Sequence, residues 1–305
     1  MFEMFQYDFM QNALLVGTVV AVVAAAVGYF VVLRGMSFAA HALAHVGFAG
    51  AAGAVLLGLS PLVGLLAFTL GGGMAMGLLG ERLRGRDVAI GIVLALALGL
   101  GALFLSLNTR YATEAFSILF GTILGVSRSD VLVTTALGAL CLLGVAVIFR
   151  PLLFASLDPE VAQARGVRVR LLSVVFLLLV AVAVSVAVQV VGVLLIFTLL
   201  VAPPATACYL TARPLRALGL AAALALAETW VGIGATYAID GTFNANWPVS
   251  FTISTGSVLA YLLARLMGPR LARPTLRRAP ATQEAMVEVE VAGGDETPVG
   301  PAPVA

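Results

Sequence analysis

The residues best suited to binding a metal ion in this chain are its two histidines, His41 and His45. They are four positions apart, so a helix would place both imidazoles on one face. Two imidazoles on one face form half of a site for a divalent ion such as Zn²⁺. If the helix begins at Met36, His45 lies roughly 13 Å along it, near the middle of a bilayer about 30 Å thick. The alternative is a pair of packed histidines that hydrogen-bond neighbouring carbonyl groups.

Three other residues within apolar stretches bear on a transport pathway. Glu228 is a lone carboxylate in the stretch 215–239. It either faces the pathway or hydrogen-bonds a neighbouring helix, and the sequence favours neither. Pro203 and Pro204 remove two backbone donors, which predicts a kink in the stretch 193–211.

A polar loop, 151–170, joins two of the apolar stretches. Asp158 suits the N-cap of a helix, and Gly166 suits a helix stop. The residues from Glu160 to Arg165 therefore predict a short helix. Such a helix, held between two membrane spans, is a natural docking surface for a cytoplasmic partner, and the alternative is an ordinary loop.

The composition indicates a membrane protein and excludes several kinds of chemistry. Hydrophobic residues make up 61% of the chain and charged residues 10%, against about 25% charged in soluble domains, and the mean hydropathy is +1.09. All 17 basic residues are arginines. Without a lysine the chain has no standard P-loop and forms no Schiff base, so ATP would have to be bound by another chain.

Apolar stretches of about 20 residues predict an all-α, polytopic transmembrane helical bundle. The run 171–211 is too long for one crossing, so it must turn once, and Gly192 is the expected place. The segment 115–126 is too short to cross upright and is expected to be a re-entrant or interfacial helix. The nine predicted spans are 9–33, 36–58, 60–80, 87–107, 130–149, 171–192, 193–211, 215–239 and 248–267.

The arginines predict the orientation of these spans. With the N-terminus outside and the C-terminus inside, Arg110 and Arg128 are the only two of the 17 arginines on the outer side. Residues 1–267 are expected to form the transmembrane domain. The tail 268–305 is rich in Pro, Gly and Ala and is expected to be a disordered cytoplasmic segment.

Three stretches of the sequence bear a family resemblance. The first is Arg34–Phe38 followed by His41, His45 and Gly50; the second is Asp158–Gly166; and the third is Val190–Ala207, which includes Pro203 and Pro204. Together they resemble the permease subunits of zinc/manganese-class ABC importers, over roughly residues 9–268. The second stretch resembles the loop through which such permeases couple to their ATPase, and the third resembles a hallmark run of Gly, aliphatic residues, Pro and small residues.

The resemblance implies a permease without enzymatic activity or a permanently bound cofactor, in the bacterial cytoplasmic (inner) membrane. It implies a homodimer with two ATP-binding subunits and an extracytoplasmic metal-binding protein. His45 matches the pathway histidine of the family. His41 stands where the family usually has an acid, which shifts the expected cargo from manganese toward zinc, and Glu228 is a candidate for the missing charge. The coupling residues implied are Asp158, Glu160, Ala162, Arg165 and Gly166.

Two other classes of transporter and one class of enzyme would show features different from those of this sequence. An ABC permease for an iron chelate or cobalamin has a wide pathway, in which paired histidines are unexpected. A proton-coupled secondary transporter usually shows several intramembrane acids or an inverted repeat. A membrane metalloprotease needs a HExxH motif, and Ala42 stands where its glutamate should be, so hydrolysis is excluded.

Overall fold

The structure of the chain is a computed structural model that describes residues 8–82, 86–107, 119, 121, 125–243 and 247–267. Within these ranges it contains helices and no strand. Most of the predicted re-entrant segment 115–126 and the whole tail 268–305 lie outside the described residues. The helices are α1 (Asp8–Leu33), α2 (Ser37–Leu56), α3 (Pro61–Arg82), α4 (Arg86–Ser106), α6 (Arg128–Leu157), α7 (Pro159–Ala164), α8 (Val169–Val191), α9 (Val193–Leu210), α10 (Pro214–Phe243) and α11 (Val249–Met267).

Eight helices of the described part are long and apolar enough to cross a membrane, and α9 adds a shorter apolar stretch, Leu195–Leu210. These nine elements coincide with the nine predicted spans, so the predicted polytopic helical bundle is confirmed. The predicted turn within 171–211 is also confirmed, because α8 ends and α9 begins at Gly192, which has φ +87°. Only glycine adopts that backbone conformation readily.

The largest difference from the predicted boundaries is at the end of the fifth span. The fifth span was expected to end at residue 149, but α6 continues through Pro151 to Leu157, so residues 151–157 are helix and not loop. Membrane helices tolerate an internal proline because neighbouring groups satisfy the carbonyl it leaves free. At its other end α6 begins with a capping box, in which Ser127 Oγ accepts from the Asp130 backbone N–H at 3.2 Å.

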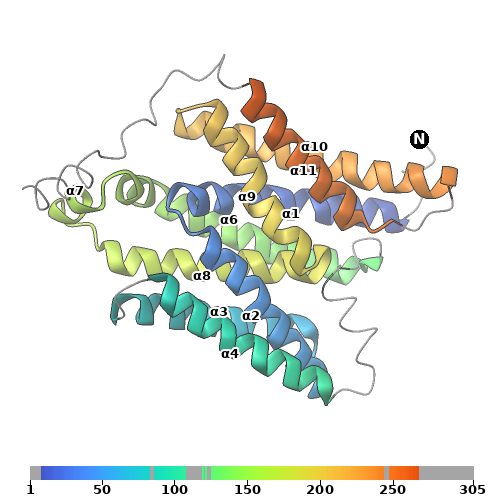
Figure 1. Ribbon diagram of the computed structural model, residues 1–305, viewed down its shortest axis with the longest axis horizontal. Helices are drawn as coiled ribbons and strands as arrows, with labels where there is room; N and C mark the ends of the chain where they lie inside the picture. The colour runs from blue at the N-terminus through green and yellow to red at the C-terminus, as the bar shows by residue number, and fades with distance from the viewer. Residues whose placement is uncertain are drawn as a thin grey trace, which may run out of the picture.

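The bundle has three parts, which Figure 1 shows from one side. Helices α1, α6 and α8 run through its middle, α2, α3 and α4 pack together on one side, and α9, α10 and α11 pack together on the other. Small residues allow close contacts between helices. Gly50 of α2 and Gly64 of α3 face each other so closely that a Cβ atom on either would collide with the carbonyl oxygen of the other.

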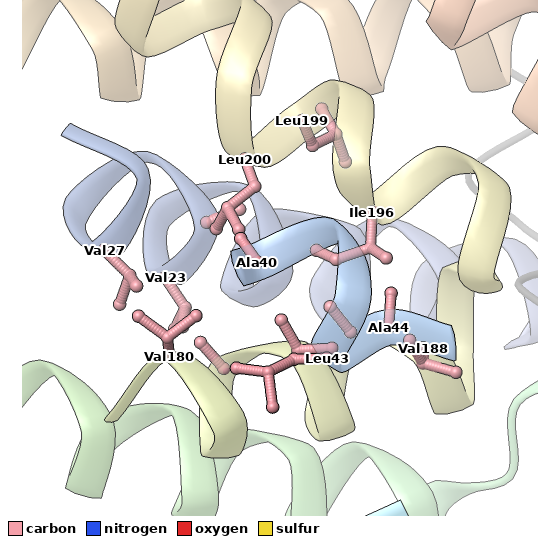
Figure 2. Close-up of a cluster of buried hydrophobic side chains, with 14 of the residues drawn as sticks. Val23, Val27, Ala40, Leu43, Ala44, Val180, Val188, Ile196, Leu199 and Leu200 are labelled. Carbon is pink, nitrogen blue, oxygen red and sulfur yellow. The ribbon is translucent and has the colours of Figure 1, made fainter. Parts of the chain in front are cut away.

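The core has a face of α2 at its centre. Figure 2 shows Ala40, Leu43 and Ala44 of α2 among side chains of α1, α8 and α9. All three residues are at most 2% exposed. This packing fixes the rotation of α2 about its own axis, and it therefore decides where the neighbouring positions 41 and 45 point.

Candidate functional site

The two histidines lie side by side on α2, as their spacing predicts. Their ring centroids are 4.7 Å apart and the ring planes meet at 81°, in an edge-to-face arrangement. Both side chains are half-buried. The pair is therefore local to one helix and is held at the boundary of the core, since Ala40 and Ala44 directly before them are buried in it.

The face of α2 that carries the histidines is open on one side. Phe38 lies one turn before His41 on that face and is 43% exposed. Ionisable side chains within a membrane face a protein partner or a water-filled cavity rather than lipid. The half-buried histidines therefore mark a part of the surface that lipid alone would not cover.

A neighbouring aromatic ring completes the surroundings of His41. Phe197 of α9 lies edge-to-face against it, with 4.8 Å between ring centroids and 66° between the planes. Sequence reasoning missed this residue. Its one signal in the sequence is its position five residues after the predicted turn at Gly192, where α9 turns back toward the core.

Glu228 has a different environment from the histidines. It lies on α10, which packs against α1, α9 and α11, and its Oε2 accepts a hydrogen bond from the Ser257 hydroxyl of α11. Its other oxygen, Oε1, is buried without a hydrogen-bond partner among the described residues. Across the described part of the chain, no three His, Cys, Asp or Glu side chains lie close enough to hold a metal ion. The Glu228–Ser257 hydrogen bond joins α10 to α11, and a place for Glu228 on the transport pathway stays a prediction.

The polar loop forms the predicted short helix, α7, at one end of the bundle (Figure 1). Asp158 caps it, with Oδ1 accepting from the Val161 backbone N–H at 3.0 Å. Gly166 ends it with φ +86°, and the Val167 N–H bonds the Ala162 carbonyl at 3.0 Å, which closes a Schellman motif.

The side chains of α7 divide into one anchor and an open face. Ala162 is fully buried against the ends of α6 and α8. Glu160 and Arg165 are exposed, with the residues between them on the outer face also exposed. Helix α7 is therefore anchored at Ala162 and exposes one charge of each sign, Glu160 and Arg165.

Pro203 and Pro204 lie inside α9. Having no N–H, they cannot bond the carbonyls of Leu199 and Leu200 one turn earlier. The Leu200 carbonyl instead lies against Gly28 of α1, where any side chain would collide with it. The prolines thus coincide with a close contact of α1 and α9, and the kink itself stays a prediction.

Comparison with known proteins identifies the family. The chain matches the ABC 3 transport family over residues 6–265. It is a member of the ABC-3 family. The manganese import system permease protein ScaB of Streptococcus parasanguinis is 34% identical over 269 residues, covering 87% of this chain and 92% of ScaB. The manganese transport system membrane protein MntC of Listeria innocua is 32% identical over 266 residues, covering 87% of this chain and 92% of MntC.

A solved structure agrees with this assignment. PsaBC from Streptococcus pneumoniae, determined in complex with a Fab, has a TM-score of 0.76 and 30% identity over 89% of this chain and 96% of its own. The predicted family is therefore confirmed, and this ABC-3 chain is the multi-pass permease subunit of a metal-ion ABC importer. The proton-coupled alternative is set aside. The expected preference for zinc finds no support in the relatives' names, which say manganese.

Proposed function

We propose that this ABC-3 permease moves a divalent transition-metal ion past His41 and His45 by alternating access, with ATP hydrolysed in partner subunits. The observation that carries the proposal is the pair of half-buried imidazoles on one face of α2. Neutral imidazole is a ligand for first-row divalent ions. A transport site must also release its ion, so an open pair of ligands suits it better than a closed cage.

The partners follow from what one chain lacks. Two imidazoles leave coordination positions open, and the described part of the chain groups no third ligand with them. The described helices also cover the histidine face only in part, since Phe197 of α9 lies against His41 while Phe38 is 43% exposed. A second permease copy covering this face would enclose the pathway, and two ATP-binding subunits would supply the hydrolysis that a chain without lysine does not. An extracytoplasmic binding protein would deliver the ion to the outer mouth.

The orientation that we propose places α7 inside the cell. Arg150, Arg165, Arg168 and Arg170 lie on this side of the bundle, as the positive-inside rule requires. The N-terminus is then outside the cytoplasmic (inner) membrane, and residues 1–267 form the permease domain. The segment 268–305 would extend into the cytoplasm.

In that orientation α7 would face the ATP-binding subunits. Its exposed residues Glu160 and Arg165 offer one charge of each sign to a partner. Movement of the docked partner would reach α6 and α8 directly, because both contact α7. ATP binding and hydrolysis would then alter the tilt of the spans around the histidines.

Two observations bear on the ion, and they favour different metals. The names of ScaB and MntC support manganese as cargo. The His41–His45 pair supports zinc, because imidazole favours Zn²⁺ and carboxylate oxygen favours Mn²⁺. We propose that this chain carries both ions, and that its two imidazoles raise zinc relative to manganese.

Metal uptake by the reconstituted importer tests the proposal. His45→Ala is expected to abolish uptake, and His41→Ala to lower it strongly, while both proteins insert and assemble normally. ATP hydrolysis by the same complexes serves as the control for assembly. Wild-type zinc and manganese uptake by the double alanine variant, normalised to inserted protein, would end the metal-pathway hypothesis.

A further inference from the structure

The turn that precedes the histidine helix is closed by backbone hydrogen bonds. Helix α1 ends at Leu33, and Arg34 and Gly35 follow, with Gly35 at φ +62°. The Gly35 N–H bonds the Val32 carbonyl at 3.1 Å, and the Met36 N–H bonds the Val31 carbonyl at 2.8 Å, which is a Schellman motif. Because α2 begins directly after it, the position of Arg34 is tied to the position of α2.

The guanidinium of Arg34 bonds the two helices on either side of α7. Its Nη2 donates to Ser173 Oγ, the fifth residue of α8, at 2.6 Å. Its Nη1 donates to Ser156 Oγ in the last turn of α6, at 3.5 Å. Its Cζ lies 5.8 Å from the centre of the Phe176 ring, within reach of a cation–π interaction. The side chain is half-buried, so these contacts are partly shielded from water.

These contacts form a short physical connection between two parts of the proposed machine. Helix α7 is joined to α6 and α8 by a few residues at each end. Arg34 holds both of those helix ends, and His41 follows Arg34 by seven positions. A displacement of α7 that moves Ser156 and Ser173 would therefore pull on the turn from which α2 starts.

We propose that Arg34 is a positioning residue that transmits movement of α7 to the histidine helix α2. The inference rests on the proposed function, because it requires α7 to receive a movement and His41 to hold the cargo. Arginine suits the role since its planar fork reaches two acceptors at once while its face lies over an aromatic ring. A lysine would offer one point of attachment and no planar face.

The test measures coupling rather than activity alone. The full importer, with its ATP-binding subunits and binding protein, is reconstituted in vesicles, and ATP hydrolysis and uptake of Zn²⁺ and Mn²⁺ are measured on the same preparation. Arg34→Gln is expected to raise the ATP hydrolysed per ion by about tenfold, a typical size for the coupling of two sites. Arg34→Lys and Ser173→Ala are expected to raise the ratio less. Arg150→Gln, an exposed arginine of α6, is the matched control and keeps the wild-type ratio.

Each outcome decides the inference. The inference is overturned if Arg34→Gln leaves the ATP hydrolysed per ion unchanged. An equal fall of the ATPase and uptake rates in folded complexes has the same meaning. If Arg34→Gln does not assemble, Ser173→Ala decides, because it removes one bond and leaves the charge in place. The proposed function is judged separately. It is refuted, and this inference with it, if the wild-type importer moves neither ion or if His45→Ala leaves uptake unchanged. A normal ratio in Arg34→Gln beside a dead His45→Ala refutes only the role of Arg34.

Discussion

The His41 ring lies edge-to-face against two other rings, with centroid distances of 4.7 Å to His45 on its own helix and 4.8 Å to Phe197 on α9. The orientation of the imidazole is therefore set partly by a residue that binds no metal. A ligand held in place by its neighbours loses less freedom when an ion binds. In the proposed function, Phe197 would thus link the first turns of α9 to the metal affinity of α2.

Phe197→Ala should weaken metal binding without preventing insertion. Removing the ring frees His41 to adopt other rotamers, so the half-saturating metal concentration for uptake should rise on the order of tenfold, as for other changes beside a metal ligand. Phe68→Ala is the matched control. It removes a similar ring from an aromatic pair with Phe104, on helices α3 and α4, and Phe68 contacts α2 at Gly50, five residues past His45. If Phe197→Ala and Phe68→Ala raise the half-saturating metal concentration equally, Phe197 contributes packing and does not orient His41.

His41→Asp should shift the preference of the importer from zinc toward manganese. The carboxylate is the acid that the family resemblance implies at this position, and it offers the harder ligand that Mn²⁺ prefers. His41→Asn has nearly the same shape without the charge, and it should lower uptake of both ions without the shift. Uptake of each ion in competition with the other gives the ratio. A ratio that does not move in His41→Asp would contradict the assignment of His41 as a ligand.

Uptake should decline as the outside becomes more acidic. Only a neutral imidazole binds a metal ion, and an unperturbed histidine takes up its proton at a pH of about 6.5. Initial rates are measured from about pH 7.5 down to about pH 5.5, with the inside of the vesicles held constant. A rate that does not change over this range would contradict a neutral imidazole as the metal ligand.

Gly64→Ala should destabilise the bundle, because a Cβ atom there would collide with the Gly50 carbonyl across the α2–α3 contact. Overpacking of this kind costs typically about 1–3 kcal/mol. Gly71→Ala, in the same helix, meets nothing within 4 Å and should be neutral or slightly stabilising, since alanine is the better helix former. Thermal unfolding in detergent measures both. Equal melting temperatures for the two variants would show that α2 and α3 can separate slightly without cost.

Local patterns were sufficient to predict much of this molecule. The spans follow from the length of their apolar stretches. The break at Gly192 follows because the apolar run from 171 to 211 is too long for a single crossing. The shared face of His41 and His45 follows from helical periodicity alone. The caps of α7 were predictable because Asp158 and Gly166 act through backbone groups only a few residues away.

Contacts between distant parts of the chain could not be predicted in this way. Arg34 and Ser173 are 139 positions apart, and neither position has a local pattern that points to the other. Phe197 reaches His41 only because α8 and α9 fold back at Gly192. The extension of α6 through Pro151 was missed for a related reason, since a proline ends most helices in water and is tolerated when neighbouring helices satisfy the freed carbonyl.

Gly166→Ala should disturb the end of α7, the helix proposed to dock the ATP-binding subunits. Gly166 has φ +86° and nothing within 4 Å of where its Cβ would be, so Gly166→Ala strains the backbone without causing a collision. The strain opposes the Schellman motif that closes α7 and should displace the exposed Glu160 and Arg165 from their partner. Transport per ATP hydrolysed should fall, while the permease remains folded and inserted.

Two further variants make that prediction specific to α7. Gly219→Ala adds the same methyl group to α10, where nothing lies within 4 Å and the φ angle is ordinary for a helix, and it should leave coupling unchanged. Reversing the charges with Glu160→Arg and Arg165→Glu leaves the backbone alone and should weaken assembly with the ATP-binding subunits, most clearly at low salt, because exposed charges are screened as salt rises. Normal assembly and normal coupling in both Gly166→Ala and the reversed pair would show that the subunits dock elsewhere.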